Sequence, residues 1–553
     1  MSPERLLQHF DQIAEAPDAV PRLRRFILDL AVRGKLVEQN PEDEPASKLL
    51  KRIREKRGRM SRHSGNVDCP IEITEAELPF EIPENWEWVP STEPAVVISD
   101  KGKKVQTKDV LEFGKFPVVD QGRMFIRGYC NDAQKVIRID GPIVVFGDHT
   151  RETKLIDFDF VVGADGVKLL KPIEVNPAFY FLALQWIPLE SRGYGRHFKL
   201  LRASRIPLPP LAEQHRIVAK VDELMALCNA LEAAKTRREK RRDKLVAATL
   251  HGLSNGDESG EPGICLTIED SARFYFNHLP RLTTRPEHIQ QLRQTILNLA
   301  VRGKLVPQDP ADEPATEILK RVEAEKRRRI EKGEIRKPKQ LGPLSVSDYP
   351  FEIPLSWAWI RLGQVAHLIT KGSTPTSYGH SFVQSGINFI KVEAIKNGRL
   401  SAENVTSFIT EETHEFLKRS QLAIGDFLFS IAGSIGTCAV VNKTILPANT
   451  NQALAIIRGA DAAFLVTFLQ YLMRSCLLES ALAKARGGAM NNISLEDVSH
   501  FPLPIPPFAE QHRIVAKVDE LMALCDKLEA QLTNTATTRR HFIEATLQDA
   551  LSA

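Results

Sequence analysis

The sequence lacks the features that would assign it at once to several common classes of protein. It contains no run of 18 or more apolar residues, and its first residues, MSPERLLQHFDQ, include no apolar signal region. This predicts a soluble, cytoplasmic protein with no membrane partner. The seven cysteines are odd in number and form no C-x-x-C pair, and the 14 histidines form no H-x-x-x-H pair. Neither redox nor zinc chemistry is therefore expected.

Motifs for nucleotide hydrolysis and methyl transfer are missing as well. There is no G-x-x-x-x-G-K-S/T phosphate loop, which argues against an ATP motor. The nearest approach to the D/N/S-P-P-Y/F loop of amino-methyltransferases is IPPF at 505–508, where isoleucine cannot accept a hydrogen bond from a base amine. Asp148, Glu152 and Lys154 could suggest a Mg²⁺-dependent nuclease, but they crowd one turn and the second half of the chain has no equivalent. We expect no catalytic residue and no metal site in this chain.

The net charge is small and its distribution is more informative than its value. A charge of +4 neither requires nor excludes a nucleic-acid partner, but basic runs occur at 51–63, 237–244 and 320–339. Such clusters can contact phosphates. Two of the runs lie on probable helices that also carry Glu and Asp, so solvated helix faces remain the alternative.

The dominant feature of the sequence is an internal repeat. LAEQHRIVAKVDELMALC at 211–228 returns as FAEQHRIVAKVDELMALC at 508–525, with 17 of 18 positions identical. LAVRGKLV and PFEIP also occur twice, while the inserts 91–205 and 361–500 share no comparable run. The interval from PFEIP to the late repeat is 26 residues longer in the second copy. The chain is therefore predicted to be a duplicated frame that carries two different readers.

Apolar spacing predicts the structure of this frame. Ile217, Val221, Leu224, Cys228 and Leu231 follow the a/d pattern of a coiled coil, as do their equivalents in the second copy. We expect each long helix to pack antiparallel against its duplicate about a pseudo-twofold axis. Short β-branched runs broken by Gly, Asp and Asn predict α/β inserts. The predicted domains are a helical frame at 1–77, an insert at 78–210, a long helix at 211–252, a linker at 253–282, a second frame at 283–348, a second insert at 349–507 and a second long helix at 508–553.

The repeated frame and its inserts resemble the specificity subunit of type I restriction-modification enzymes over nearly the whole chain. The resemblance rests on PLPPLAEQHRIV at 207–218, PIPPFAEQHRIV at 504–515, KGSTP at 371–375, GDFLFSIAGSIG at 425–436 and FPVVDQG at 116–122. It implies an α/β fold with two target recognition domains joined by long antiparallel coiled-coil helices.

The resemblance also implies a function and partners. The subunit is non-catalytic and needs no cofactor, and each recognition domain reads one part of a split, asymmetric sequence in double-stranded DNA. Two methyltransferase subunits modify adenine with S-adenosylmethionine, and two restriction/translocase subunits use ATP and Mg²⁺, in the prokaryotic cytoplasm. A self-contained nuclease or methyltransferase and a coiled-coil adaptor are the alternatives, and the adaptor leaves two large unlike inserts without a purpose.

The candidate DNA contacts are polar residues in glycine-rich or turn-rich parts of the inserts. Arginine can bind guanine through O6 and N7, and Asn or Gln can read adenine, although each residue could instead contact a phosphate or only solvent. Asn451 and Gln452 could also line a turn or the core. The candidates are Gln121, Arg123, His149, Arg151, Lys154, Arg192, Tyr194, Arg196, His197 and Lys199 in the first insert, and Lys371, Ser373, Thr374, Thr376, Tyr378, His380, Ser434, Asn449, Asn451, Gln452, Arg486, Asn491 and Asn492 in the second.

A second set of candidates lies at the start of each long helix. These polar residues are repeated identically where the insert joins the helix, which fits either partner docking or intramolecular packing with helix capping. They are Glu213, Gln214, His215 and Arg216 in the first copy, and Glu510, Gln511, His512 and Arg513 in the second.

Overall fold

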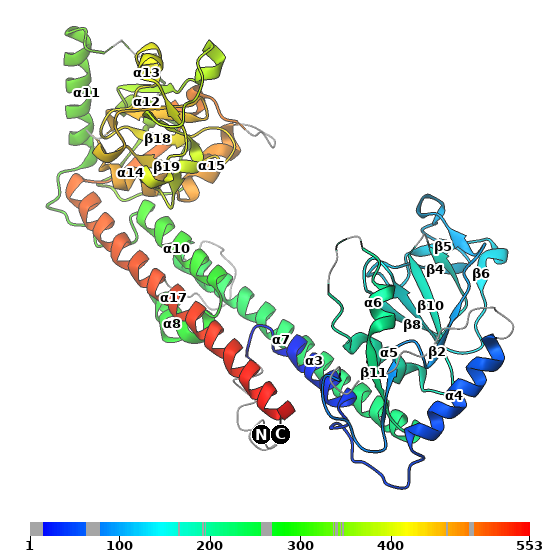
Figure 1. Cartoon of the computed structure of the whole chain (residues 1–553). Coiled ribbons are helices and arrows are strands. Elements are labelled where there is room, and N and C mark those ends of the chain that lie inside the picture. Colours follow the sequence, from blue (N-terminus) through cyan, green and yellow to red (C-terminus); the bar gives the residue numbers. More distant parts are fainter. Residues whose placement is uncertain are drawn as a thin grey trace. The chain divides into compact units, whose positions relative to one another are not determined.

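The chain forms two compact units, which are described one at a time (Figure 1). The first comprises residues 1–239 together with 535–553, and the second comprises residues 240–534. Each unit thus contains one copy of the repeat and the end of the other copy's long helix. The computed structural model describes residues 15–61, 78–163, 166–190, 193, 195–255, 268–335, 337, 341–342, 344–345, 348–460, 463–485 and 492–552.

The frame of the first unit is built from α-helices. The predicted apolar stripe of α7 (Leu211–Asn255) is buried at Ile217, Val221 and Cys228, in one core with residues of α3 (Ala19–Val32) and α4 (Ala46–Ser61). The end of α17 (Phe508–Ser552) adds Ile543 and Leu547, which pack with the start of α3. The stripe therefore packs on the early frame of its own copy, and the other long helix contributes its end.

The frame of the second unit has the same construction. Here α17 buries Ile514, Val518 and Cys525 in the core that contains α10 (Pro286–Val301) and α11 (Ala315–Glu331). The end of α7 joins this core through Val246, Leu250 and Leu253. Each long helix consequently starts in one unit and ends in the other, and for α7 the change falls at Glu239.

Part of the predicted linker is folded. Residues 268–282 form α8 (Ile268–Asn277) and α9 (Leu279–Leu282), and Tyr275 and Leu282 are buried in the core of the second unit. The Tyr275 hydroxyl lies 3.0 Å from Thr283 Oγ1, so its polar end is satisfied inside the protein. The linker prediction was too long because it was based on the composition of the preceding Gly- and Ser-rich stretch, most of which lies outside the described residues.

The first insert enters and leaves the frame through two paired strands, β1 (Glu87–Pro90) and β11 (Arg205–Leu208). Between them a four-stranded antiparallel sheet has the order β2-β10-β7-β8, and β4 pairs in parallel with β9 in a second sheet. The helices of this insert are α5 (Pro177–Trp186) and α6 (Phe198–Ala203). The strands are β2 (Ala95–Ile98), β3 (Lys104–Val105), β4 (Phe116–Val119), β5 (Gly128–Cys130), β6 (Val136–Ile137), β7 (Ile143–Gly147), β8 (Thr153–Ile156), β9 (Phe160–Gly163) and β10 (Val167–Pro172).

The second insert repeats this plan. Its boundary strands β12 (Ala358–Arg361) and β22 (Pro502–Ile505) pair antiparallel, its four-stranded sheet has the order β13-β21-β18-β19, and β14 pairs in parallel with β20. Its other strands are β13 (Leu368–Lys371), β14 (Ile387–Ile390), β15 (Ile395–Lys396), β16 (Arg399–Leu400), β17 (Phe408–Ile409), β18 (Phe427–Ser430), β19 (Cys438–Val440), β20 (Ala448–Thr450) and β21 (Leu454–Arg458). Its helices are α12 (Leu362–Val365), α13 (Glu411–Phe416), α14 (Val466–Leu472), α15 (Cys476–Ala485) and α16 (Leu495–Ser499).

The two inserts are therefore alike in topology although they share no sequence run comparable to the frame. Strands β2, β7, β8, β9 and β10 of the first correspond in order and pairing to β13, β18, β19, β20 and β21 of the second. The prediction of two α/β domains is confirmed. Across the described ranges, no helix is both long enough and apolar enough to cross a membrane.

The three repeated segments of each copy meet at one junction. Gly34 of LAVRGKLV has φ +69°, and a Cβ atom there would lie 2.5 Å from Pro83 Cγ, in the PFEIP segment. Gly303 has φ +68° and the same relation to Pro354. Only glycine combines a left-handed backbone with so close an approach, which explains why this residue occurs in both copies.

Replacing either junction glycine should destabilise its unit. We expect Gly34→Ala and Gly303→Ala each to lower the free energy of unfolding by about 2 kcal/mol or more, because the new Cβ is strained at positive φ and overlaps a proline ring. Urea unfolding of the full chain, followed by circular dichroism, measures the effect. The control is Gly58→Ala in α4, where no atom lies within 4 Å of the new Cβ. A Gly34→Ala midpoint equal to the wild-type value would contradict the role of the junction.

Candidate nucleic-acid interface

In the first insert, two loops form one polar surface at the end of the four-stranded sheet. The turn after β7 is tied to the loop after β4, because Gln121 Oε1 accepts a hydrogen bond from the His149 amide at 3.2 Å and the Gln121 carbonyl accepts one from Thr150 Oγ1 at 2.5 Å. A Cβ on Gly166 would lie 2.7 Å from His149 Cδ2. Two of the predicted residues, Gln121 and His149, are therefore brought together by long-range packing.

The same turn positions the start of α6. The Asp148 carboxylate accepts a hydrogen bond from the Phe198 amide at 2.7 Å, and the Asp148 carbonyl accepts one from the His197 amide at 2.8 Å. This places Arg196 and Lys199, both exposed, beside the turn that carries Arg151. Asp148 was considered at the sequence level only as a possible metal ligand, and its capping role could not be seen because its partners lie about 50 residues away in the chain.

Two of the predicted contacts in the first insert are buried. His197 is fully buried, and its Nδ1 lies 2.9 Å from the Asp148 carbonyl oxygen. Lys154 Nζ donates to the carbonyls of Asp120 at 2.8 Å and Met124 at 2.5 Å, and burial lowers the pKa of this ammonium group. These side chains hold loops in place, which corrects the prediction that they face DNA.

The exposed candidates in this insert are cationic side chains. Arg123 is 92% exposed, with Nε 3.4 Å from a carboxylate oxygen of Glu152. Arg151 is exposed, has φ +66° and donates from Nη1 to the Leu189 carbonyl at 2.8 Å. Arg192 and Tyr194 lie outside the described residues.

In the second insert, the loop after β13 packs on the turn between β20 and β21. The Ser373 amide donates to the Thr450 carbonyl at 3.0 Å, and Thr374 Oγ1 donates to Gln452 Oε1. Gly372 is required in this loop, because a Cβ there would overlap the carbonyl oxygen of Thr450. Lys371, Thr376 and Gln452 are exposed on this surface.

Aromatic residues extend this surface toward α13. The Tyr378 and Phe416 rings lie 5.8 Å apart and both are exposed. His380 lies 4.8 Å from the same Phe416 ring, and its Nδ1 is 3.1 Å from Thr413 Oγ1. In Figure 1, α13 lies at the end of this domain remote from the start of α17.

The asparagines of the second insert have different environments. Asn449 is fully buried and donates to the Leu417 carbonyl at 3.1 Å and to Ser420 Oγ at 2.8 Å, which corrects its prediction as a DNA contact. Asn451 accepts a hydrogen bond from the Ala453 amide at 3.2 Å, as expected of a turn residue. Asn492 pairs with Ala432 near the exposed Ser434. Arg486 and Asn491 lie outside the described residues.

Corresponding ends of the two sheets carry the candidate residues. In the first insert this end is marked by the pairing of Gly147 with Val167, and in the second by the pairing of Ser430 with Leu454. Lys371 lies at the same end of the second sheet, opposite Ala455. Two inserts with unlike sequences thus present unlike polar side chains from one common framework.

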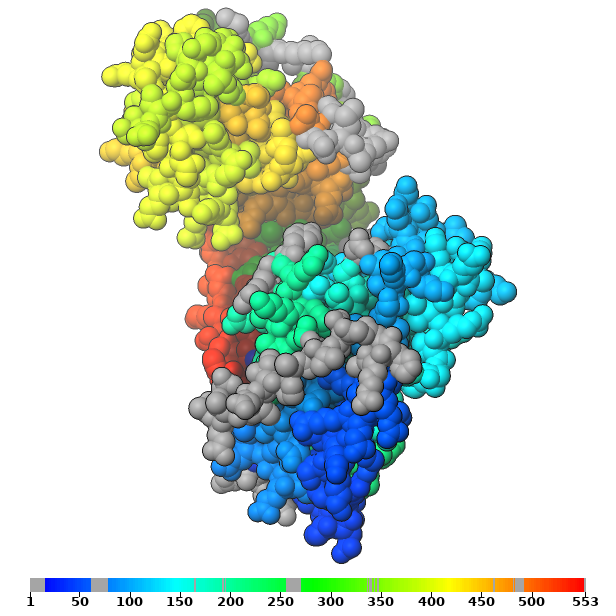
Figure 2. Space-filling model, turned by 45° about the vertical axis from the view of Figure 1, so that its right-hand side comes forward, coloured from blue at the N-terminus to red at the C-terminus, as the bar shows by residue number. Residues whose placement is uncertain are grey.

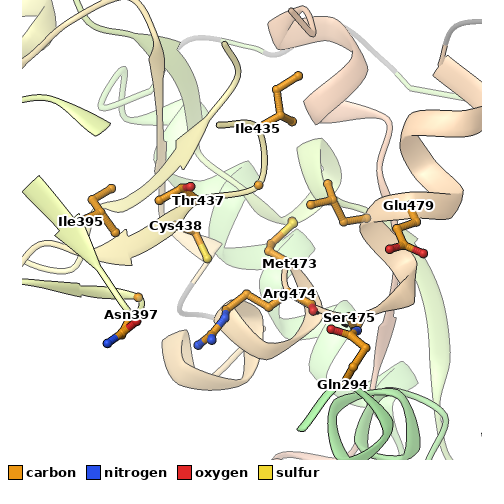
Figure 3. A pocket seen from close by; sticks show the side chains of 13 residues that line it. Gln294, Ile395, Asn397, Ile435, Thr437, Cys438, Met473, Arg474, Ser475 and Glu479 are labelled. Carbon is orange, nitrogen blue, oxygen red and sulfur yellow. Dashed lines mark hydrogen bonds between the residues drawn. The ribbon is translucent and has the colours of Figure 1, made fainter. Parts of the chain in front are cut away.

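A cavity of about 420 Å³ borders the Ser434 loop of the second insert (Figure 3). The Arg474 side chain points across it toward Asn397, which lies in a hairpin at φ +52°. None of its lining residues was predicted from the sequence, because they come from four separate segments. The polar lining residues are Gln294, Asn397, Thr437, Arg474, Ser475 and Glu479.

The repeated glutamate of each long helix is buried in the frame junction. Glu213 accepts hydrogen bonds from Trp86 Nε1 at 2.9 Å and Gln39 Nε2 at 2.5 Å, and Glu510 accepts them from Trp357 and Gln308 at the same distances. Burial raises the pKa of both carboxyl groups despite these donors. The first turn of each long helix is therefore held to the other frame segments of its own copy by a buried glutamate, which is an uncommon residue in a protein interior.

The repeated glutamine joins the insert to the frame. Gln214 Oε1 accepts a hydrogen bond at 2.8 Å from the amide of Asn176, the N-cap residue of α5. Gln511 Oε1 does the same at 2.8 Å for Leu465, the N-cap residue of α14. Both glutamines are fully buried, so intramolecular packing accounts for them.

The remaining frame candidates are nearer the surface. Arg216 forms an ion pair with Asp43 at 2.7 Å, and Arg513 forms one with Asp312 at 2.5 Å. His215 Nδ1 lies 2.9 Å from the side-chain amide of Asn176, whereas the His512 ring meets Phe508 edge-on at 5.6 Å. The arginines bind within the frame, and the histidines are the exposed members of the set.

Comparison with known proteins matches each insert together with the first part of the long helix that follows it. A family model described as the type I restriction modification DNA specificity domain matches residues 83–239 and 354–538. The specificity subunits of the type I restriction enzymes EcoAI and EcoEI of Escherichia coli are each 29% identical to this chain, over 96% of this chain and 94% of theirs. A chain from a structural study of complex assembly and conformational transition of the type I R-M system is 20% identical, with a TM-score of 0.48, over 86% of this chain and 99% of that chain.

The buried glutamates should make stability depend on pH. Because the folded-state pKa of Glu213 and Glu510 is raised, the folded chain binds more protons than the unfolded chain between their ordinary and raised values. The free energy of unfolding should therefore fall as pH rises above about 4.5 through this range. We expect Glu213→Gln/Glu510→Gln to reduce this slope, measured by urea unfolding at several pH values.

Exposed glutamates of the same helices provide the control. Glu223→Gln/Glu520→Gln makes the same change in net charge without altering the junction. If both double variants change the slope equally, the buried position is not its cause.

Proposed function

Because the chain belongs to the family of type I restriction-modification DNA specificity subunits, we propose that each of its inserts reads one half of a split, asymmetric DNA target. Its function is DNA sequence recognition, and it is a non-catalytic subunit. The observation that supports two unlike half-sites is the common topology of the inserts combined with different side chains at corresponding sheet ends.

The side chains at each sheet end suit different base contacts. The first insert presents mainly arginines, whose guanidinium groups bind phosphates or the O6 and N7 atoms of guanine. The second presents hydroxyl and amide groups near Gln452 and an exposed aromatic pair, with Lys371 as a phosphate contact. Gln can bind adenine through N6 and N7, so the half-sites should differ in composition.

The long helices support two equivalent docking sites for one kind of partner. All 18 positions of 211–228 have the same burial class as their counterparts in 508–525. Packing explains identity at the buried positions, but His215, Asp222, Glu223 and Leu227 are exposed and also identical in the second copy. Since the duplicated inserts have diverged while these exposed positions have not, the face is under a second constraint, which a shared partner provides.

We assign this face to the modification subunits. The complex would hold two methyltransferase subunits, which use S-adenosylmethionine to methylate adenine, and two restriction/translocase subunits that use ATP and Mg²⁺. The specificity chain itself would bind none of these cofactors, and the complex would act on double-stranded DNA in the prokaryotic cytoplasm. A stand-alone nuclease is not favoured, because Asp148 and Lys154 are occupied in loop packing. A stand-alone methyltransferase is not favoured, because the IPPF segment at 505–508 offers no polar side chain to a base amine.

Variants in the two inserts should affect separate halves of the target. Arg123→Ala should relax base preference in one half and Gln452→Ala in the other, each costing roughly 1–3 kcal/mol of discrimination. Selection of bound duplexes from a randomised library by the assembled methyltransferase complex measures this. Lys244→Ala, which removes an exposed cation from α7 outside the identical stretch, is the control. If one variant relaxes both halves, the assignment of one insert to one half is wrong.

Variants on the helices should change stoichiometry in steps. Leu227 is 60% exposed and Leu524 is 47% exposed, and a charge there should oppose docking of an apolar partner surface. We expect Leu227→Glu to leave one methyltransferase subunit on the chain and Leu227→Glu/Leu524→Glu to leave none, measured by native mass spectrometry. Leu245→Glu changes another exposed leucine of α7 outside the identical stretch and should retain two. Two subunits retained by the double variant would place the docking site elsewhere.

A further inference from the structure

The loop between β4 and β5 exposes apolar side chains beside the cationic surface of the first insert. Arg123, Met124 and Phe125 follow one another in this loop, and Met124 is 54% and Phe125 50% exposed. In Figure 2 the part of the chain around these strands, blue to cyan, forms a projecting lobe of the first domain. Clustered apolar groups on a surface commonly mark a binding site.

The loop is held in one conformation by bonds from neighbouring segments. The buried Lys154 ammonium donates to the carbonyls of Asp120 and Met124, and Thr150 donates to the carbonyl of Gln121. The Asp120 carboxylate also accepts a hydrogen bond from the Gly122 amide at 2.8 Å. Burying a lysine is unfavourable unless its donors are satisfied. The carbonyls of this loop satisfy the Lys154 ammonium, and the same hydrogen bonds fix the backbone that carries Met124.

The two apolar side chains are not equivalent. The Phe125 ring meets Phe158 edge-on, with centroids 6.0 Å apart, so part of it is used within the domain. Met124 is bonded through its backbone, and its long unbranched side chain is free to adapt to an apolar partner. Its neighbour Arg123 provides a cation suited to phosphate or guanine.

DNA offers one apolar group on its base edges in the major groove, the 5-methyl group of thymine. We propose that Met124 contacts a thymine methyl group in the half-site read by the first insert, and so acts as a specificity-determining residue. This inference rests on the proposed function, because it requires that the insert bind DNA through this surface.

The second insert provides an internal comparison. The segment that follows its corresponding strand β14 is Lys391, Val392 and Glu393, with the Lys391 ammonium 4.7 Å from the Phe382 ring. It has no exposed methionine or aromatic residue at this place. A methionine contact to thymine at this place should therefore be confined to the half-site read by the first insert.

The test replaces thymine by deoxyuridine, which removes only the methyl group. After the target has been identified by methylation sequencing, the assembled methyltransferase complex is titrated with duplexes that carry one such replacement at a time. Loss of one buried methyl group should weaken binding about fourfold at a position in the first insert's half-site. Met124→Ala should bind the thymine and deoxyuridine duplexes equally at that position, with the affinity that wild type has for the deoxyuridine duplex.

Met60→Ala serves as the matched control, because it removes another exposed methionine, from α4, and should keep the fourfold difference. The inference is overturned if no thymine in that half-site is sensitive, or if the sensitivity persists in Met124→Ala. It is also overturned if Met124→Ala instead removes a DNA bend measured by fluorescence energy transfer, which would indicate a wedge between base pairs. A failure of the proposed function would look different, because the wild-type complex would then not prefer its target over a randomised duplex.

Discussion

The hydrogen bond from a tryptophan indole to a buried glutamate, made once in each copy, is the constraint on which the rest of the structure depends. Trp86 follows PFEIP, where the chain enters the insert, and Glu213 lies in the first turn of the long helix, where the chain leaves it. Gly34 packs on the same tryptophan from the early frame. One buried contact thus fixes the early helices, the insert and the long helix relative to one another within each unit. An unpaired buried carboxylate would be costly, so these partners must occur together.

The sequence predicted the periodic parts of this fold well. Apolar spacing identified both long helices and the buried stripe through Ile217 and Val221. A helix packed on one side has buried apolar residues every three to four positions, and this spacing can be recognised in the sequence. It did not predict that the stripe is buried in one core with α3 and α4 of its own copy, since an apolar face does not specify its partner. Nor did it predict the folded segment around Tyr275, whose burial depends on contacts distant in the chain.

Candidate DNA contacts were harder to judge for a physical reason. Lys154, His197 and Asn449 have the same chemistry as residues that bind DNA, but Lys154 lies in β8, Asn449 lies in β20, and all three are buried. Whether such a side chain is exposed or is buried and hydrogen-bonded within the protein depends on carbonyls and amides some 30 to 50 residues away. By contrast, Gln121 and His149 were predicted separately and are joined by the fold. The common topology of the inserts was also hidden, because strand order is fixed by burial patterns that many sequences satisfy.

The pairing of β1 with β11, and of β12 with β22, has a consequence for how such proteins change over generations. Since each insert starts and ends on adjacent, hydrogen-bonded strands, the chain returns to the frame beside the point at which it left, whatever the length of the insert between them. Homologous recombination between the repeated frame sequences of different genes can then transplant a whole insert, provided that the new insert supplies a helix that packs on the frame and meets the repeated glutamine as α5 does. A new insert, and with it a new DNA specificity, can in this way be acquired in a single genetic event.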